Sequence, residues 1–233
     1  MKTPASLKTS PTASTGKPTR RAAAKPGRKP ARKSGPLAHE IRIIGGQWKR
    51  TKLKVHDRPG LRPTPDRVRE TLFNWLGQDL TGWRCIDAFA GTGALGFEAA
   101  SRGALEVRLI EHDGALVEQL KQVQVQLKAD MTQVVRGDGV TALKQLNPAS
   151  MDLILLDPPF DSGLYEAALQ ASGRAVSAQG FVYLEAPTAW TDAQLESAHL
   201  VVHRHLKAGA VHAHLLRRQP DGGAGDTALA KPA

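Results

Sequence analysis

The regular alternation of strands and helices after Trp83 constrains the fold of this chain more than any other feature. Helical patterns occupy 94–102, 113–128, 139–145, 163–172 and 191–197. Apolar runs predict strands at 83–88, 105–111, 132–136, 151–157, 180–185, 200–207 and 210–217. This alternation predicts an α/β fold, in which helices cover both faces of a mainly parallel seven-stranded sheet. The last two strands are expected to pair antiparallel, because only Gly209 and its neighbours separate them.

A smaller unit is expected ahead of the sheet, at 39–80. Apolar residues flank Gly45-Gly46 on both sides, which predicts two short strands joined by a glycine turn. The helix that follows is predicted to have Thr64 as its N-cap and Pro65 as its first helical residue, and to run to about Leu76. We interpret this unit as an arm.

The charge is distributed unevenly along the chain. It holds 32 Lys and Arg against 22 Asp and Glu, a net charge of +10, yet residues 1–39 contain ten of the basic residues and no acid. Large apolar side chains are almost missing there, which predicts a disordered basic tail, either solvated or holding RNA phosphates. The expected organisation is a tail at 1–38, the arm at 39–80, a main domain at 81–218 and a second disordered tail at 219–233.

The composition also excludes several classes of protein. A single cysteine, Cys85, excludes an internal disulfide and a cysteine-based metal site. No run of 18 apolar residues predicts a membrane span. The N-terminus lacks the apolar segment of a secretory signal, and its prolines oppose the amphipathic helix of an organelle transit peptide. We expect a cytoplasmic, monomeric protein without membrane contact.

Acidic residues close four successive predicted strands. In open α/β sheets the carboxyl ends of the strands form the edge at which ligands bind. Capping of a turn would explain Asp87 alone, and a Gly-Asp-Gly turn would explain Asp138 alone. Four such residues along one edge favour a ligand crevice; they are Asp87, Glu111, Asp138 and Asp157.

The glycines after the strand at 83–88 predict a nucleotide site. Gly91, Gly93 and Gly96 form a G-x-G-x-x-G pattern, and Glu111 has the spacing of a carboxylate that binds ribose hydroxyls. Asp87 stands four residues before Gly91, where it would repel a pyrophosphate but attract the ammonium group of a methionine moiety. The pattern therefore favours S-adenosylmethionine, and an NAD-dependent dehydrogenase is the alternative.

The segment Asp157-Pro158-Pro159-Phe160 follows an apolar strand. Its two prolines force the backbone out of the strand and leave an acid and a ring at the sheet edge. Such a pair can bind the amino group of a flat base while the ring stacks on the base. The alternative is a Pro-Pro turn in which Phe160 is an ordinary core ring.

Basic residues crowd the segment 40–69, which has nine Lys and Arg against three acids. This predicts a surface that binds RNA phosphates, or else a solvated basic face. Arg62 and Arg69 have a second interpretation, which is to anchor the helix to the crevice, and Trp48 is either a stacking or a packing ring. Four histidines of the terminal hairpin stand at alternate positions, so the two on each strand are expected to share a face of the sheet. For these residues we favour contact with solvent or RNA over a metal site; they are His203, His205, His212 and His214.

The glycine motif, its acids and Asp157-Pro158-Pro159-Phe160 resemble the motifs of class I S-adenosylmethionine-dependent methyltransferases that modify exocyclic amino groups. The stretches 41–50 and 62–74 are similar to those of the RsmD family of bacterial 16S rRNA guanine-N2 methyltransferases. This resemblance covers about residues 40–218. It implies a Rossmann-like class I fold and S-adenosylmethionine as cofactor, with no metal. The implied partner is 16S rRNA, within the small ribosomal subunit or its precursor.

The resemblance also implies roles for individual residues. Glu111 would bind the ribose hydroxyls and Asp138 the adenine, whereas the methionine part would be held by Asp87, Phe89, Gly91 and Gly93. The implied catalytic segment is Asp157, Pro158, Pro159 and Phe160, in which the acid and the Pro158 carbonyl hold the target amino group. The implied substrate contacts are Arg42, Lys49, Arg50, Arg62, Thr64, Arg69, Asn74 and Tyr165.

The activity that this resemblance implies is methyl transfer to the exocyclic N2 of a guanine, at position 966 of 16S rRNA. Enzymes that act on adenine or glutamine amino groups more often have Asn at the position of Asp157. An acid at this position agrees with guanine as the target base. Another base or a protein amide is the alternative target. A non-catalytic RNA-binding protein is disfavoured, because it has no use for a cofactor pocket.

Overall fold

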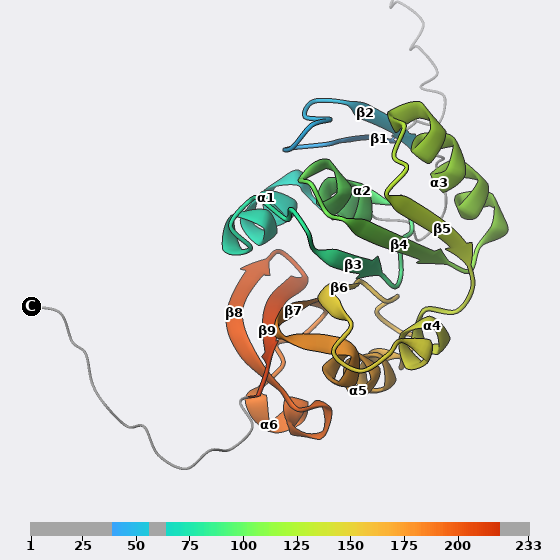
Figure 1. The fold of residues 1–233 in the computed structure, drawn as a ribbon. Helices are drawn as coiled ribbons and strands as arrows, with labels where there is room; N and C mark the ends of the chain where they lie inside the picture. The colour runs from blue at the N-terminus through green and yellow to red at the C-terminus, as the bar shows by residue number, and fades with distance from the viewer. Residues whose placement is uncertain (1–38, 56–63, 220–233) are drawn as a thin grey trace, which may run out of the picture. The chain divides into compact units, whose positions relative to one another are not determined.

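A computed structural model describes residues 39–55 and 64–219, all of which belong to one unit, Pro36–Ala233 (Figure 1). The predicted tail at 1–38 lies outside the described residues, as does all but the first residue of the predicted tail at 219–233. Arg62 also lies outside them, within 56–63.

A seven-stranded sheet forms the centre of the described structure. Its order is β5-β4-β3-β6-β7-β9-β8, with parallel pairing from β5 to β7 and antiparallel pairing of β9 with both neighbours. The order reverses between β3 and β6, so the strand ends diverge there and leave room for a ligand. The strands are β3 (Arg84–Asp87), β4 (Glu106–Glu111), β5 (Thr132–Arg136), β6 (Met151–Leu156), β7 (Val176–Ala186), β8 (Leu200–Ala208) and β9 (Val211–Arg218).

Helices cover both faces of this sheet, as the alternating pattern predicts (Figure 1). Alternate strand residues point to opposite faces, so Leu155 and Tyr183 join one buried cluster whereas Leu156 and Leu184 join the other. The first cluster packs against α1 (Asp66–Trp75), α2 (Ala94–Ser101) and α3 (Gly114–Leu127). The second packs against α4 (Gly139–Gln145), α5 (Tyr165–Ala175), α6 (Asp192–Leu195) and the short 3-10 helix Glu196–Ala198.

The arm consists of a hairpin and α1. Strands β1 (His39–Arg42) and β2 (Lys52–Val55) pair antiparallel on either side of the glycine turn, as expected. Ile41, Ile43 and Leu53 from this hairpin join the first buried cluster, together with the apolar stripe of α1. The hairpin is therefore part of the core that covers the sheet.

The start of α1 differs from the prediction. Pro65, not Thr64, is the N-cap, the first helical residue is Asp66, and no side chain caps the helix. The hydroxyl of Thr64 is instead hydrogen-bonded to the carboxyl group of Glu185, and Thr64 is buried. A tertiary partner thus replaces the local helix cap that the sequence pattern predicts.

The terminal hairpin also differs from the prediction. A register shift between Val202 and Arg204 marks a bulge in β8. A bulge breaks strand alternation, so His203 lies against the Phe181 ring while His205 lies against His214 on the other face. The expectation that His203 and His205 share a face is therefore wrong.

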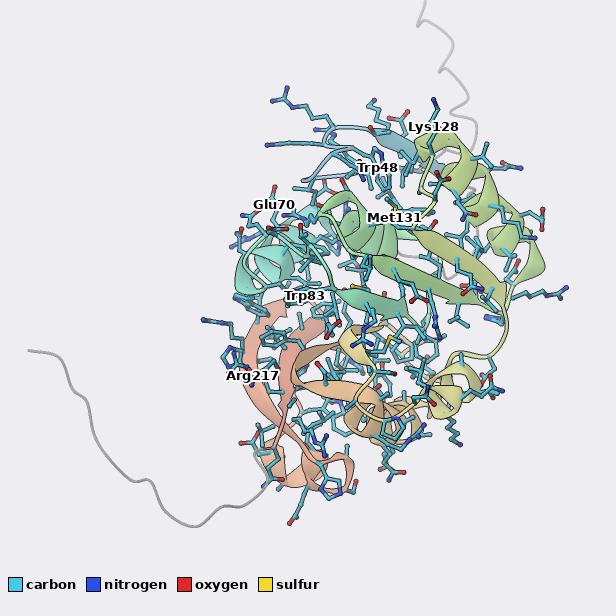
Figure 2. The ribbon with its side chains drawn as sticks, viewed as in Figure 1. Trp48, Glu70, Trp83, Lys128, Met131 and Arg217 are labelled. Carbon is cyan, nitrogen blue, oxygen red and sulfur yellow. The ribbon has the colours of Figure 1, made fainter. Side chains whose placement is uncertain are left out.

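Aromatic rings close the amino end of β3 and β6. Trp83 stacks on Phe181 with ring centroids 6.1 Å apart, and the Arg217 guanidinium lies over the same ring at 4.9 Å (Figure 2).

None of the helices within 39–55 and 64–219 has the length and apolar character needed to cross a membrane.

Candidate active site

Three acidic side chains meet where β3, β6 and β7 end. Asp87 closes β3, Asp157 follows β6, and Glu185 is the next-to-last residue of β7. The strand β6 lies between the other two, with Asp87 paired to Leu155 and Leu156 paired to Leu184. Asp87 and Glu185 are only 1% and 3% exposed, and Asp157 is partly buried.

Burial of these carboxyl groups makes their negative charges costly. It raises the pKa of Asp87 to about 7, against backbone hydrogen bonds from Gly96 and Phe89 that lower it. Burial also raises the pKa of Asp157 well above its usual value, and the charges of Glu185 and Asp87 add to this. The pKa of Glu185 is raised by burial too, although hydrogen bonds from Thr64 and Tyr183 oppose the shift. Such an edge attracts a cation and favours partners that donate hydrogen bonds.

The glycine loop between β3 and α2 is tied to the ends of two strands. The Gly91 N–H donates to Oε2 of Glu111 at 2.8 Å, and the Gly96 N–H donates to Oδ2 of Asp87 at 3.0 Å. Gly91 and Gly93 have φ angles of 51° and 80°, which favour glycine. A Cβ atom at Gly93 would lie 2.6 Å from the side chains of Leu120 and Phe97. This position therefore requires glycine for both its conformation and its packing.

Three buried oxygen atoms at this edge lack a hydrogen-bond partner within the described part of the chain. They are Oδ1 of Asp87, the hydroxyl of Tyr165 and the hydroxyl of Ser162. Unpaired buried polar groups are rare in folded proteins and often belong to a ligand site. Oδ1 of Asp87 has the chemistry that an ammonium group needs. Asp87 therefore fits the ammonium group at the methionine end of S-adenosylmethionine.

The segment after β6 turns outward as its prolines predict. Pro158 is buried and Pro159 is exposed, and the Pro159 carbonyl accepts a hydrogen bond from the Ser162 N–H at 3.0 Å. Phe160 is 38% exposed, so the interpretation of its ring as an ordinary core ring is wrong. An exposed ring next to Asp157 is available for stacking.

Tyr165, the first residue of α5, borders the same edge. Its ring lies 6.0 Å from the ring of Trp190. Burial raises the pKa of its hydroxyl to about 12, with further contributions from the charges of Asp157, Asp161 and Glu185. The hydroxyl is therefore a neutral donor at physiological pH.

Asp138 and Glu111 extend the acidic edge toward β4 and β5. Asp138 is exposed and caps α4, since its side chain accepts a hydrogen bond from the Thr141 N–H at 2.7 Å. Hydrogen bonds from the side chain and then the backbone of Thr141 lower the pKa of Asp138. Glu111 is buried and also accepts a hydrogen bond from the Asp113 N–H at 2.8 Å. A Cβ atom at Gly139 would lie 2.1 Å from the Ala88 carbonyl oxygen, so α4 begins directly against the end of β3.

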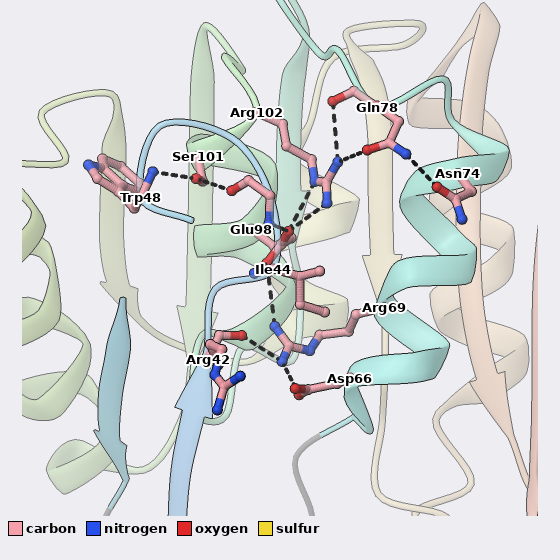
Figure 3. Close-up of polar contacts among 11 residues, drawn as sticks. Arg42, Ile44, Trp48, Asp66, Arg69, Asn74, Gln78, Glu98, Ser101 and Arg102 are labelled. Carbon is pink, nitrogen blue, oxygen red and sulfur yellow. Dashed lines mark hydrogen bonds and ion pairs between the residues drawn. The ribbon is translucent and has the colours of Figure 1, made fainter. Parts of the chain in front are cut away.

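The buried carboxylate of Glu98 is the centre of the polar contact between the arm and α2, and Ser101 adds further hydrogen bonds to the hairpin (Figure 3). Glu98 accepts hydrogen bonds from the backbone N–H groups of Ile44 at 2.8 Å and Gly45 at 2.7 Å. Arg102 donates to it from Nε at 3.0 Å and Nη2 at 2.8 Å, and Nη1 of Arg69 lies at 3.5 Å. Glu98 thus joins the hairpin, α1 and the helix that follows the glycine loop.

Arg69 belongs to this network rather than to an RNA-facing surface. Its side chain is fully buried, and its Nη2 atom donates to the Arg42 carbonyl at 2.8 Å and to Asp66 at 2.6 Å. These contacts do not agree with direct phosphate contact. Arg69 does anchor its helix, but to the hairpin and α2 and not to the crevice as the second interpretation expected. Asn74 is exposed and accepts a hydrogen bond from the Gln78 side chain (Figure 3).

Other predicted substrate contacts remain accessible. The side chains of Arg42, Lys49 and Arg50 are exposed. Trp48 is partly buried against the first core cluster, and its backbone N–H donates to the Ser101 hydroxyl at 3.0 Å. These contacts favour the packing interpretation of Trp48.

Three of the terminal-hairpin histidines have ring nitrogens within hydrogen-bond distance of a partner in the protein. His214 is buried and accepts a hydrogen bond from the Trp190 N–H at 3.0 Å, and burial lowers its pKa to about 4. His205 and His212 are 2.9 Å apart. Residues 39–55 and 64–219 contain no group of three or more His, Cys, Asp or Glu side chains that could hold a metal ion.

Glu185 is the site residue that sequence reasoning missed. It ends the predicted strand at 180–185 and therefore occupies the same edge as the other four acids. The position of Glu185 at the end of a predicted strand is the signal that could have identified it as a site residue. This strand lies beyond the glycine motif and is followed by no recognisable turn motif, so nothing else in the sequence pointed to Glu185.

Comparisons with known proteins agree with this geometry. A family model described as conserved hypothetical protein 95, Cons_hypoth95, matches residues 41–217. Ribosomal RNA small subunit methyltransferase D from Escherichia coli K12 is 40% identical over 185 residues, which are 78% of this chain and 92% of the relative. The protein of the same name from Haemophilus influenzae is 45% identical over 133 residues, 56% of this chain and 69% of the relative.

A solved structure supports the same assignment. The Escherichia coli protein yhhF, described as a candidate methyltransferase, superimposes with a TM-score of 0.66 and 37% identity, over 78% of this chain and 99% of that chain. The fold is accordingly the Rossmann-like fold of class I methyltransferases. Since the family model spans most of the sequence and the Escherichia coli relative is 40% identical over 92% of its length, the chain belongs to the RsmD family.

Proposed function

We propose that this protein is an S-adenosylmethionine-dependent rRNA methyltransferase that modifies the exocyclic N2 of a guanine in small-subunit rRNA. The observation that carries the proposal is the acidic edge formed by Asp87 and Asp157 beside the glycine loop. Membership of a family with relatives named small subunit methyltransferase D supports the rRNA target.

The cofactor would lie along the ends of β3, β4 and β5. Asp87 would bind the ammonium group through its unpaired Oδ1 atom, and the glycine loop would approach the ligand closely. Glu111 would bind the ribose hydroxyls, and Asp138 would bind the adenine amino group. When bound, S-adenosylmethionine supplies a methyl group that its sulfonium makes electrophilic.

Asp157 and the Pro158 carbonyl would hold the target amino group. The lone pair of a guanine amino group is delocalised into the ring, so this nitrogen is a weak nucleophile. A fixed acceptor for each N–H bond holds the nitrogen in line with the methyl carbon. The same acceptors stabilise the positive charge that grows on the nitrogen during transfer.

The target base must leave its stack to reach Asp157. Recognition of single, unstacked RNA bases commonly uses aromatic side chains. Phe160 is exposed at this edge and would stack on the base, with Tyr165 beside it. The stacking partly offsets the cost of removing the base from its neighbours.

The basic arm would hold the surrounding rRNA. Arg42, Lys49 and Arg50 are exposed on the hairpin, where contacts to phosphates would orient the substrate without reading its sequence. Because Glu98 joins this hairpin to α2, the RNA-binding surface would keep a fixed position relative to the cofactor.

The test supplies isotopically labelled S-adenosylmethionine with small ribosomal subunits that lack the modification, followed by mass spectrometry of the methylated base. We expect label on the N2 of a single guanine. Asp157→Ala should lower the rate of transfer about a hundredfold or more, because a transition-state acceptor is lost, while cofactor affinity stays near normal.

Asp161→Ala is the matched control, since Asp161 is an exposed acid four residues further along the chain. We expect this variant to keep most of its activity. Full activity of the Asp157→Ala variant, or label on adenine or on a protein amide, would refute the proposal.

A further inference from the structure

Glu185 is a buried carboxyl group that the proposed reaction does not yet use. Leu155 and Tyr183 are partners on β6 and β7 and join the same buried cluster. Strand residues two positions apart share a face. Asp157 and Glu185 therefore lie side by side at the strand ends, and the charge of Glu185 helps to raise the pKa of Asp157.

The two carboxyl groups differ in the hydrogen bonds that they receive. Glu185 accepts hydrogen bonds from the Tyr183 hydroxyl at 2.9 Å and from the Thr64 hydroxyl. No residue within 39–55 and 64–219 donates a hydrogen bond to Asp157. Donors stabilise an ionised carboxylate, so the negative charge is favoured on Glu185 and the proton on Asp157.

The charged and titratable groups around Glu185 offer no compensating cation among the described residues. Asp87 faces it from β3, Asp157 from β6, Tyr165 from α5 and Tyr183 from its own strand. Two adjacent carboxyl groups, one buried and one partly buried, titrate as a pair that shares one proton when no cation lies beside them. The arm takes part in this pair through Thr64.

We propose that Glu185 is a positioning residue that shares a proton with Asp157 and thereby sets the pH at which Asp157 accepts the hydrogen of the target amino group. The inference rests on the proposed function. During transfer the amino nitrogen forms a bond to the methyl carbon as the carbon–sulfur bond breaks toward sulfur. The nitrogen then loses one proton, its N–H electron pair stays on nitrogen, and the carboxylate pair takes the proton.

The test is a carbon-13 NMR titration of Asp and Glu carboxyl groups in the cofactor-free full chain, in which the Asp157→Asn spectrum identifies the Asp157 signal. Glu185→Gln removes the neighbouring charge and keeps the shape of the side chain. We expect the Asp157 titration midpoint to fall by about one pH unit or more. The acid limb of the kcat/KM profile for rRNA should move in the same direction.

Two further variants sharpen this test. Thr64→Val removes one donor from Glu185, so the shared proton moves toward Glu185 and the Asp157 midpoint falls by less than in Glu185→Gln. Glu106→Gln is the matched control, because Glu106 begins β4 at the opposite end of the sheet and pairs with Arg108. It should leave both the Asp157 midpoint and the pH profile unchanged.

The outcomes separate this inference from the proposed function. An unchanged Asp157 midpoint in folded Glu185→Gln overturns the inference, as does a rate that falls equally at every pH. If Glu185→Gln does not fold, an unchanged midpoint in Thr64→Val overturns it instead. If the natural chain transfers no methyl group to rRNA, the proposed function fails, while the titration still decides whether the two carboxyl groups share a proton.

Discussion

At the scale of single residues, Asp87 is charged only above about neutral pH in the cofactor-free protein. Burial raises its pKa to about 7, and the nearby charges of Glu111 and Glu185 add to the shift. Below that pH the carboxyl group is protonated and gives little attraction to an ammonium group. At the proposed site, the ammonium group of S-adenosylmethionine would therefore compete with a proton for the same oxygen atoms.

This competition predicts that affinity for S-adenosylmethionine rises as pH rises from about 6 to about 8, with Asp87 near the midpoint. Asp87→Asn should remove most of this pH dependence and weaken binding about tenfold to a hundredfold, as expected for loss of a charged hydrogen-bond partner. Calorimetry across this pH range checks both effects. Equal affinity at all pH values in the natural protein would show that Asp87 is not the ammonium ligand.

The same residue makes a prediction about stability. Its folded-state pKa of about 7 exceeds the ordinary value of 3.8, so the folded state binds a proton more tightly than the unfolded state. The stability that this proton contributes is present at low pH and is lost as pH rises through about 7. Urea unfolding of cofactor-free protein should show this fall, and Asp87→Asn should make it shallower, because the contributions of Asp157 and Glu185 remain.

At the scale of elements, a buried carboxylate is the centre of the polar contact between the arm and α2. Glu98 receives hydrogen bonds from the hairpin backbone and from Arg102, and it pairs with the buried Arg69. Its removal would leave two buried guanidinium groups without their shared counter-ion. Such losses cost far more than the loss of an ion pair at the surface.

We predict that Glu98→Ala lowers the free energy of unfolding by about 3–5 kcal/mol, the range for breaking a buried ion pair by removal of one partner. Chemical denaturation measures this change. Glu118→Ala, which removes an exposed acid that pairs with Lys121 on α3, should change stability by less than about 1 kcal/mol. Similar small effects for both variants would contradict the central role of Glu98.

Local sequence patterns predicted the helices and strands well, because each helix or strand depends on residues that are close in sequence. Apolar runs predicted every strand of the large sheet, and the acids that follow these strands predicted the edge at which the candidate site lies. The bulge at His203 was not predictable, because the histidines alternate regularly in sequence on both sides of it. The burial of Arg69 was ambiguous, since an arginine in a basic segment fits a phosphate contact and an ion pair equally well.

At the scale of the whole molecule, the contacts that sequence reasoning missed join segments far apart in the chain. Thr64 was expected to cap its own helix, yet its partner is Glu185, which lies on β7. The partner of Glu98 is a hairpin more than 50 residues earlier. No periodicity or spacing identifies such partners, because side-chain type alone does not say which distant group will be adjacent.

These long-range contacts predict the result of truncation. A chain that begins at residue 39 keeps every contact described above, and we expect it to fold and bind the cofactor normally. A chain that begins at residue 81 loses the apolar residues of the hairpin and α1, so the first core cluster would be exposed. We expect that chain to aggregate, as light scattering and circular dichroism would reveal. A soluble, folded product would show that the sheet domain is autonomous.

The position of Glu98 has a consequence for how members of this family diverge. Glu98 is the shared hydrogen-bond acceptor of a hairpin and the shared counter-ion of two arginines. A substitution of Glu98 therefore affects all three partners, and a substitution of one arginine changes the charge balance of the other. Chimaeras that graft the arm of one homologue onto the catalytic body of another would therefore succeed only where both parents carry an acid at this position. A graft that moves the proposed RNA-binding hairpin between homologues then requires transferring the hairpin together with the helix that receives it.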